Sequence, residues 1–310
     1  MRHEASLRYG VYITASKTDP FRVRARRTFG WLLLIGLVLS LWAFGVEPAS
    51  LRVREYPLAI PGWPAGRAGM RIALLSDLHV GSPHNGMDKL DEVVRRTNAA
   101  RPDLVLILGD LVIQDVVGGR FVPPETIAPA LGQLRAPLGV YAVLGNHDRW
   151  LDGRRVLAAL SSAGIPVLED RAVEISHGGP PFWLVGVSDY WTAPHDVRSA
   201  LSQVTDGAPA LLFTHNPDIF PRIPARVPLT LAGHTHGGQV HVPLIGRPVV
   251  PSVFGERYAI GHVVEGGRHL FVTAGVGTSI LPVRFLVPPE ISIVRLQPDG
   301  GQFSRAARAR

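Results

Sequence analysis

The stretch RIALLSDLH, residues 71–79, decides the fold class of this chain. Its first five residues form a short, mostly apolar run that is typical of a buried strand, and two side chains that can bind a metal, Asp77 and His79, follow it. The same arrangement returns in LVLILGD, residues 104–110, and in GVYAVLGNHD, residues 139–148. Helical periodicity separates these runs. Strand, helix, strand, helix, strand predicts a layered α/β fold.

Further strands are predicted in the second half of the chain. Six more apolar runs lie at residues 172–175, 182–187, 210–214, 229–232, 270–274 and 291–296. Two facing sheets accommodate this number better than one sheet does. We therefore predict a four-layer α/β/β/α sandwich of two mixed sheets flanked by helices, over residues 71–298.

An apolar segment, FGWLLLIGLVLSLWAFGV, occupies residues 29–46 and contains no charge over 18 residues. This length is near the minimum for a helix that crosses a membrane. Four arginines in residues 22–27 precede it, so the positive-inside rule places a basic tail, residues 1–28, in the cytoplasm and the domain outside. Arg26 and Arg27 also resemble a twin-arginine export signal, which is later cleaved. We predict a retained transmembrane anchor, with cleavage as the alternative.

Two segments flank the predicted domain. Residues 47–70 hold four prolines and three glycines, and they are predicted to be a lead-in loop with one edge strand at residues 51–56. Residues 299–310 are predicted to be a C-terminal tail.

The charge of the chain is concentrated near its start. The net charge is +7, and residues 1–46 carry seven basic and two acidic groups, which leaves +2 on the other 264 residues. This balance gives no broad cationic face, so we expect no nucleic-acid binding. Nothing in the sequence indicates a protein partner. The absence of cysteine excludes disulfides, thiolate nucleophiles and sulfur-ligated zinc.

Polar side chains follow five of the apolar runs. They are Asp77, His79, Asp110, Asn146, His147, Asp148, His215, His234 and His236. Because the carboxyl ends of strands in an α/β fold converge on the ligand crevice, we expect these side chains to meet. Aspartate, histidine and one amide oxygen suit divalent manganese, iron or zinc. Asp110 could bridge two such metal ions. Two neighbouring metal ions can activate a water molecule and clamp a phosphoryl group.

Each motif alone has an ordinary explanation. Asp-x-His is usually a turn or a helix cap, and Gly109-Asp110 is a common turn dipeptide. Gly-Asn-His-Asp at 145–148 is more specific, because a glycine before three polar residues, directly after an apolar run, allows a tight functional turn. Gly-His-Thr-His at 233–236 is also fairly specific, because two histidines in three residues are costly to bury without polar partners. Chance is a poor explanation for all of these motifs occurring together in this order, each directly after an apolar run.

Together these motifs resemble the calcineurin-like metallophosphoesterase superfamily over residues 71–296. Residues 271–279 and 282–290 further resemble its membrane-associated bacterial branch, which includes phosphodiesterases and a lipid-sugar pyrophosphatase. The resemblance implies one ion held by Asp77, His79, Asp110 and His236, and a second held by Asp110, Asn146, His215 and His234. It also implies that His147 faces the scissile phosphate instead of binding metal, and that Asp148 orients its ring. Ile113 stands where purple acid phosphatases place an iron(III)-binding tyrosine. Its presence favours two divalent metal ions that are not redox-active.

The resemblance implies a hydrolase with two divalent ions. The predicted substrate is a phosphate ester, either a phosphodiester or an ester in a lipid or cell-wall polymer, attacked by a hydroxide that bridges the ions while His147 assists the leaving alcohol. A UDP-activated acylated sugar cleaved at its pyrophosphate is the alternative substrate, and it requires a cytoplasmic domain. A membrane-tethered metal-binding scaffold is the alternative without catalysis. Intact His147 and Asp148 argue against that scaffold.

Overall fold

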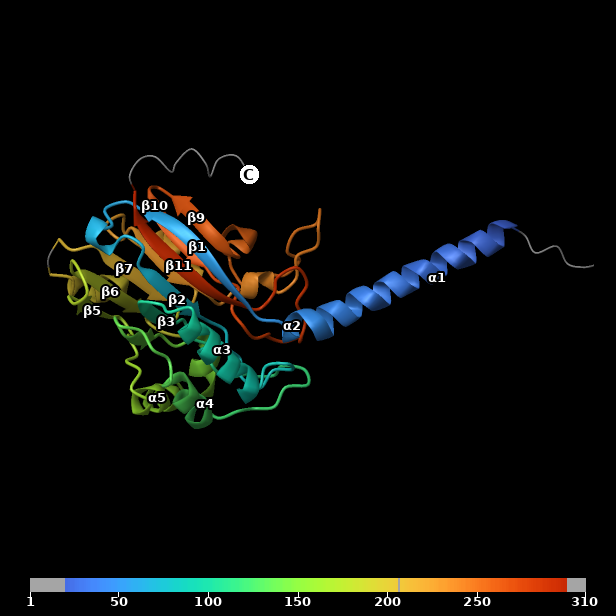
Figure 1. Ribbon diagram of the computed structural model, residues 1–310, viewed down its shortest axis with the longest axis horizontal. Helices are drawn as coiled ribbons and strands as arrows, with labels where there is room; N and C mark the ends of the chain where they lie inside the picture. Colours follow the sequence, from blue (N-terminus) through green and yellow to red (C-terminus); the bar gives the residue numbers. More distant parts are fainter. Residues whose placement is uncertain (1–19, 206, 300–310) are drawn as a thin grey trace, which may run out of the picture. The chain divides into compact units, whose positions relative to one another are not determined.

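The computed structural model describes residues 20–205 and 207–299 (Figure 1). The chain divides after Leu41 into two compact units. In its described part the first unit is the helix α1 (Pro20–Leu41), and the second, which we call the catalytic unit, begins at Trp42. The first 19 residues of the predicted basic tail, and the C-terminal tail from residue 300, lie outside the described residues.

The N-terminal apolar helix is longer than the sequence pattern predicts. It continues through one turn of π-helix, η1 (Trp42–Val46), into the short α2 (Glu47–Ala49). The segment Arg24–Ala49 spans 26 residues with a mean hydropathy of 2.2, which is long and apolar enough to cross a membrane. A signal sequence has the same properties. The helix is therefore either a signal or a single membrane span.

Two mixed sheets make up the catalytic unit. The first has the order β1 (Arg52–Ile60), β11 (Glu290–Pro298), β2 (Arg71–Leu75), β3 (Leu104–Ile107), β4 (Val140–Ala142). The second has the order β5 (Arg171–Ile175), β6 (Phe182–Val187), β7 (Ala210–Thr214), β8 (Leu229–Ala232), β10 (Arg268–Val272), β9 (Gly261–Glu265). Neighbouring strands β2, β3 and β4 are parallel, and so are β6, β7 and β8.

Helices cover the outer face of each sheet. The first sheet packs against α3 (Met87–Ala99), α4 (Pro124–Leu131) and α5 (Asn146–Ser162). The second packs against α6 (Val197–Ser202) and the short 3-10 helices η3 (Pro217–Arg222) and η5 (Gly255–Tyr258). The inner faces of both sheets share one apolar core. The predicted α/β arrangement of two mixed sheets flanked by helices is confirmed.

Two features differ from the sequence-based prediction. The edge strand β1 runs on to Ile60, and Leu58, Trp63 and Met70 are buried between the sheets, so residues 57–70 are part of the folded unit. The helices α5 and α6 and the strand β9 were not predicted. The first of these bears on the site, because the Gly-Asn-His-Asp motif forms the first turn of α5 and is not a tight turn between strands.

The end of the apolar helix is built into the catalytic unit through Glu47. The Glu47 side chain is 4% exposed, and its carboxylate accepts hydrogen bonds from the backbone N–H groups of Leu286 (3.0 Å) and Val287 (2.7 Å). The indole N–H of Trp42 donates to the same carboxylate at 2.7 Å. These bonds join two segments about 240 positions apart in the sequence.

We predict that Glu47→Ala destabilises the catalytic unit. The substitution leaves the buried N–H group of Val287 and the partly buried N–H group of Leu286 without acceptors, at a cost of about 1–3 kcal/mol. Urea denaturation of the full chain in a mild detergent measures the loss. Glu125→Ala, which removes an exposed ion pair with Arg155, is the control and leaves the midpoint nearly unchanged. Equal midpoints for the two variants would contradict the prediction.

Candidate metal centre

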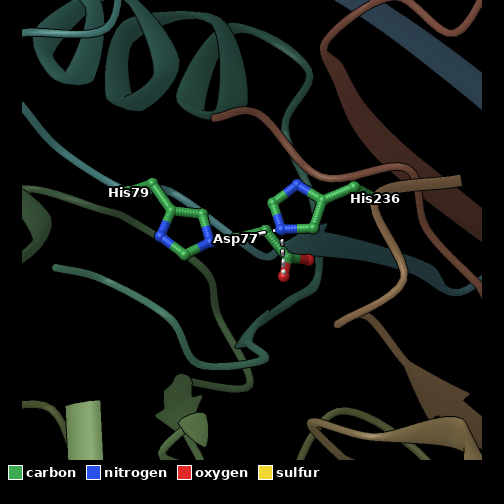
Figure 2. Close-up of side chains that lie close together, drawn as sticks. All are labelled: Asp77, His79 and His236. Carbon is green, nitrogen blue, oxygen red and sulfur yellow. Dashed lines mark hydrogen bonds and ion pairs between the residues drawn. The ribbon is translucent and has the colours of Figure 1, made fainter. Parts of the chain in front are cut away.

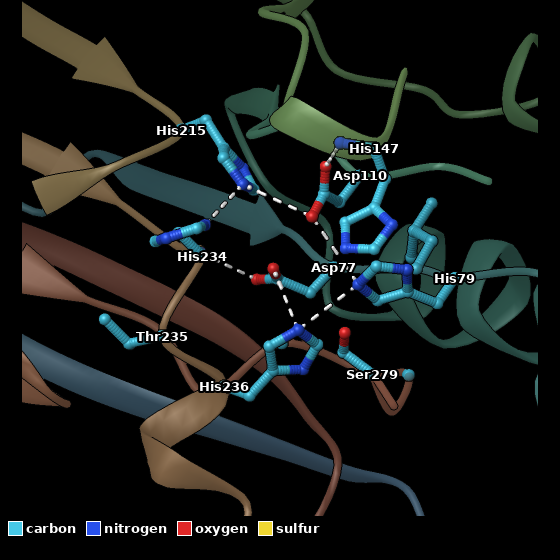
Figure 3. A network of polar contacts seen from close by, with 12 residues as sticks. Asp77, His79, Asp110, His147, His215, His234, Thr235, His236 and Ser279 are labelled. Carbon is cyan, nitrogen blue, oxygen red and sulfur yellow. Dashed lines mark hydrogen bonds and ion pairs between the residues drawn. The ribbon is translucent and has the colours of Figure 1, made fainter. Parts of the chain in front are cut away.

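Loops from both sheets meet at one edge of the sandwich, and Figure 3 shows the side chains that they bring together. Asp77 and His79 follow β2, and Asp110 follows β3. The second sheet contributes His215 after β7, and the pair at positions 234 and 236 after β8. Because these strands are parallel within each sheet, their carboxyl ends point to the same edge. Asn146 and His147 enter from the first turn of α5.

The first cluster consists of Asp77, His79 and His236 (Figure 2). The Nε2 atoms of His79 and His236 are 3.2 Å apart, and the two rings are stacked with centroids separated by 5.0 Å. The Nε2 atom of His236 lies 3.4 Å from Oδ1 of Asp77. All three side chains are buried. Two ring nitrogens and one carboxylate oxygen thus face a common point.

The second cluster consists of Asp110, His215 and His234. The Nε2 atom of His215 lies 3.3 Å from Asp110 Oδ2, 3.0 Å from Asn146 Oδ1 and 3.0 Å from His234 Nδ1. The same Oδ2 atom of Asp110 lies 3.5 Å from Nε2 of His79 in the first cluster. One carboxylate oxygen therefore faces both clusters, as a ligand that bridges two ions must.

The histidines are arranged as metal ligands are. The Nδ1 atom of His79 lies 3.0 Å from the carbonyl oxygen of Val112, and Nδ1 of His215 lies 2.7 Å from that of Leu108. A histidine that donates one ring N–H to a carbonyl presents its other nitrogen to a metal. Among the described residues, the buried Asp77 Oδ1 has no hydrogen-bond partner. Buried polar atoms are rarely left unpaired, so this donor set fits cations.

Burial and neighbouring charges shift the pKa values of the cluster in opposite directions. Burial lowers the pKa of His79 to about 4, and it holds the pKa values of His234 and His236 well below the ordinary value. Burial also disfavours the charged form of His215, but the adjacent Asp110 carboxylate outweighs it and raises that pKa to about 10. Without metal, Asp110 and His215 therefore form a buried ion pair, while the other three histidines are neutral.

The backbone at the ligands is in a costly conformation. Positive φ angles occur at Asp77 (52°), His79 (38°), Asp110 (57°), His234 (69°) and His236 (52°). The left-handed region costs a residue with a side chain roughly 1–2 kcal/mol. Such strain persists only where the surrounding structure imposes it, and it is concentrated at functional sites. Five of the seven candidate ligands have such a backbone conformation.

Asp148 does not orient the His147 ring as the resemblance implied. Its carboxylate accepts hydrogen bonds from the backbone N–H groups of Gly145 (3.0 Å), Asp110 (2.8 Å) and Leu111 (2.9 Å). In the part of the chain that the structure describes, Nδ1 of His147 has no hydrogen-bond partner. The third residue of a helix is placed to accept from the N–H groups at the helix start, which explains the difference. Asp148 thus holds the loop that carries Asp110.

A second loop supports the first cluster, and the sequence motifs did not identify its role. A side-chain carbon added at Gly275 or Gly277 would lie 2.7 Å from the Cβ atom of Asp77 or His79, respectively. The fully buried Arg284 fixes this loop, because its guanidinium donates to the carbonyl oxygens of residues 274, 275, 277 and 287. The two glycines in the stretch 271–279 were the available signal.

We predict that Asp148→Asn lowers stability and leaves the titration of His147 unchanged. An amide group has one acceptor oxygen for three backbone donors, so the free energy of unfolding falls by about 2–3 kcal/mol. Urea denaturation measures the stability, and the imidazole NMR signal of His147 measures its pKa. A changed His147 pKa with unchanged stability would restore the orienting role.

Comparison with known proteins gives a consistent assignment. The model of the calcineurin-like phosphoesterase family matches residues 70–238. The chain is 30% identical over 255 residues to the uncharacterized metallophosphoesterase YkuE of Bacillus subtilis (strain 168), a match that covers 81% of this chain and 87% of that protein. It is 33% identical over 255 residues to phosphodiesterase YaeI of Escherichia coli (strain K12), with 81% and 90% covered. A bovine transmembrane protein with metallophosphoesterase domain is 31% identical, with 81% and 58% covered.

Solved structures include more distant matches. Phosphopantetheinyl hydrolase (PptH) from Mycobacterium tuberculosis has 13% identity and a TM-score of 0.38, with 69% of this chain and 92% of that chain covered. The NAD nucleotidase (NadN) of Haemophilus influenzae has 14% identity and a TM-score of 0.44, with 67% and 46% covered. At these values neither structure bears on the substrate.

The family uses a dimetal centre, and the two clusters provide His and Asp side chains for one. Family match, bacterial relatives and site geometry agree: the chain belongs to the calcineurin-like phosphoesterase family and is a metallophosphoesterase, a hydrolase.

Proposed function

We propose that this enzyme hydrolyses a phosphodiester at a centre of two divalent ions. The observation that carries the proposal is the Asp110 carboxylate, whose Oδ2 atom faces His79 at 3.5 Å and His215 at 3.3 Å. The proposed ligands are Asp77, His79, Asp110 and His236 for one ion, and Asp110, Asn146, His215 and His234 for the other. Two bound ions lower the pKa of a water and stabilise negative charge on a phosphoryl group.

His147 is the proposed catalytic residue of the protein itself. Its backbone N–H donates to Asp110 Oδ1 at 2.9 Å, which fixes the residue beside the clusters, and its ring packs edge-on against His79. Burial lowers the pKa of the imidazole, so the ring is neutral at pH 7. A neutral imidazole keeps one N–H, which can donate a hydrogen bond to the leaving oxygen as negative charge develops there.

Aromatic side chains beside the centre favour an ester with a bulky group. Trp150 packs against His147 with ring centroids 5.0 Å apart, and Trp191 packs against His234 at 4.3 Å. Both indoles are about half exposed. Trp150 also lines a cavity of about 600 Å³ together with Phe121. Such walls suit an apolar or aromatic substituent on the phosphate, and the relative YaeI is named a phosphodiesterase.

The same proposal includes a retained membrane anchor with the catalytic unit outside the cytoplasm. Cleavage after Ala43 or Gly45 would remove part of a segment that the catalytic unit holds, because Ala43 is buried and Trp42 bonds to Glu47. The arginines at residues 22–27 support the orientation. Mass spectrometry of the mature protein and a C-terminal reporter fusion in cells test retention and orientation.

We predict that the full chain with added manganese hydrolyses bis(p-nitrophenyl) phosphate, and that His147→Ala lowers kcat by about 10²–10⁴-fold. Metal content, measured by elemental analysis, stays at the wild-type value because His147 is not a proposed ligand. His177→Ala changes an exposed loop histidine and serves as the matched control. Iron(II) and zinc are compared with manganese in the same assay. If metal-loaded wild type and His147→Ala are equally inactive, the hydrolytic role of this centre is wrong.

Metal loading at pH 7 is expected to release about one proton. The pKa of His215 is about 10 without metal, so its ring must give up a proton to become a ligand. The pKa values of His79, His234 and His236 are lowered, so these rings release none. The apparent affinity therefore rises with pH up to about 10. Calorimetric titration of apo-protein with manganese in buffers of different ionisation enthalpy counts the protons, and a count of zero would contradict the assignment.

A further inference from the structure

One end of the catalytic unit exposes large apolar side chains on four segments. We call them the apolar rim. The rim consists of Trp42, Phe44 and Val46; Val117 and Phe121; Leu244, Ile245 and Val249; and Ile280, Leu281 and Leu286. In Figure 1, α2, the orange loop that follows β8 and the green loop that follows β3 lie at the same end of this unit. Contiguous exposed apolar surface of this kind marks an interaction site.

Hydrogen bonds join the four segments to one another. Leu286 N–H donates to Glu47 at 3.0 Å, which ties the fourth segment to the first. Val117 N–H donates to the carbonyl oxygen of Ile280 at 3.0 Å, which ties the second to the fourth. His241 N–H, just before the third segment, donates to the carbonyl oxygen of Phe285 at 2.8 Å. Hydrogen bonds therefore hold the four segments of the rim together.

The most exposed part of the rim is a hairpin tip. Val242 and Gly246 close it through a hydrogen bond of 2.8 Å, and Leu244 at its end is fully exposed with a φ of 71°. Ile245 is 74% exposed. Such a turn position favours glycine or asparagine, which adopt positive φ with less strain and tolerate water. The exposed side chains of Leu244 and Ile245 add nothing to the packing of the core, so they indicate contact with a partner outside the protein.

The apolar helix identifies what covers the rim. Its apolar length runs to Ala49, and its last residues, from Trp42 onward, belong to the catalytic unit. Arg284 N–H donates to the carbonyl oxygen of Ala43 at 2.9 Å, so the fourth segment of the rim adjoins the end of the helix. A helix that leaves a bilayer at this point brings the rim to the bilayer surface. The indole of Trp42, with its N–H on Glu47, is typical of that interface.

We propose that the apolar rim rests in the surface of a lipid bilayer, so that the metal centre opens there. The centre and the rim are adjacent, because Ser279 N–H donates to the side chain of Gln239 at 2.7 Å, and Gln239 is three residues after His236. Ser279 belongs to the polar network of Figure 3, and exposed Ile280 follows it. One cavity is lined both by Phe121 of the rim and by Trp150, whose ring packs against His147 beside the centre.

A position at the bilayer also indicates a class of substrate, and this part of the inference rests on the proposed function. A phosphodiester that carries a lipid alcohol would present its phosphate at the bilayer surface, with its apolar part beside the rim. Exposed Arg120 stands next to Phe121, which suits an anionic surface. The contact between the apolar rim and the bilayer does not depend on hydrolysis, so it can be tested without an activity assay.

The natural absence of cysteine allows a direct test with single labels. The full chain carrying Leu244→Cys or Ile280→Cys is labelled with a fluorophore and reconstituted in vesicles of phosphatidylcholine and phosphatidylglycerol. Quenching by nitroxide-bearing lipid is compared with quenching by aqueous iodide. Leu157→Cys on α5 and Val264→Cys on β9, both at exposed apolar positions, are the controls. We expect labels at 244 and 280 to be quenched at least about fivefold more by lipid than by iodide, and the controls to show the reverse.

A second variant separates the rim from the chemistry. Leu244→Asn combined with Ile245→Asn, in the chain labelled at position 280, is expected to halve lipid quenching and to leave hydrolysis of soluble bis(p-nitrophenyl) phosphate unchanged. Iodide quenching at 244 and 280 as strong as at 157 would overturn the proposal, whatever the hydrolytic activity. Lipid quenching at both positions in a protein that hydrolyses nothing would support the rim and contradict the proposed function.

Discussion

The site depends on the contacts of the Asp110 carboxylate, which faces both clusters of candidate ligands. A buried carboxylate is costly unless polar or charged groups surround it, and here every part of the residue is engaged. Oδ1 accepts from His147 N–H, Oδ2 faces His79 and His215, and the backbone N–H donates to Asp148. Removing the side chain of His79 or His215 would leave this buried charge incompletely satisfied. The same geometry that holds the charge also places it between two clusters.

The sandwich supplies the rigidity that this arrangement requires. Asp110 and His79 come from the first sheet, whereas His215 and His234 come from the second, so the clusters form only if the shared core fixes the distance between the sheets. The ligands also adopt strained backbone conformations, which require support from the surroundings. Packing of the two inner faces and the Arg284 clamp on the loop at 274–277 provide that support.

The segment 273–287 connects the features that matter for function. Its glycines approach Asp77 and His79, and its Arg284 donates to the carbonyl groups of the same loop. Its later residues bind Glu47 at the end of the apolar helix. The metal centre, the end of the helix and the exposed rim are therefore parts of one hydrogen-bonded structure. In the proposed placement at a bilayer, this connection would bring the metal centre to the bilayer surface.

The sequence by itself determined the α/β class, most of the strands, the apolar helix and the side chains gathered at the strand ends. It could do so because burial leaves a local pattern: apolar runs form strands, and polar residues directly after them are placed by the chain itself. Tertiary structure alone decided that Asp148 binds the backbone of Asp110, 38 positions away, and that Glu47 binds Val287, 240 positions away. It also decided which exposed apolar residues form one rim. Such contacts depend on where the sheets bring distant segments together, and no periodicity within a short stretch of sequence records that.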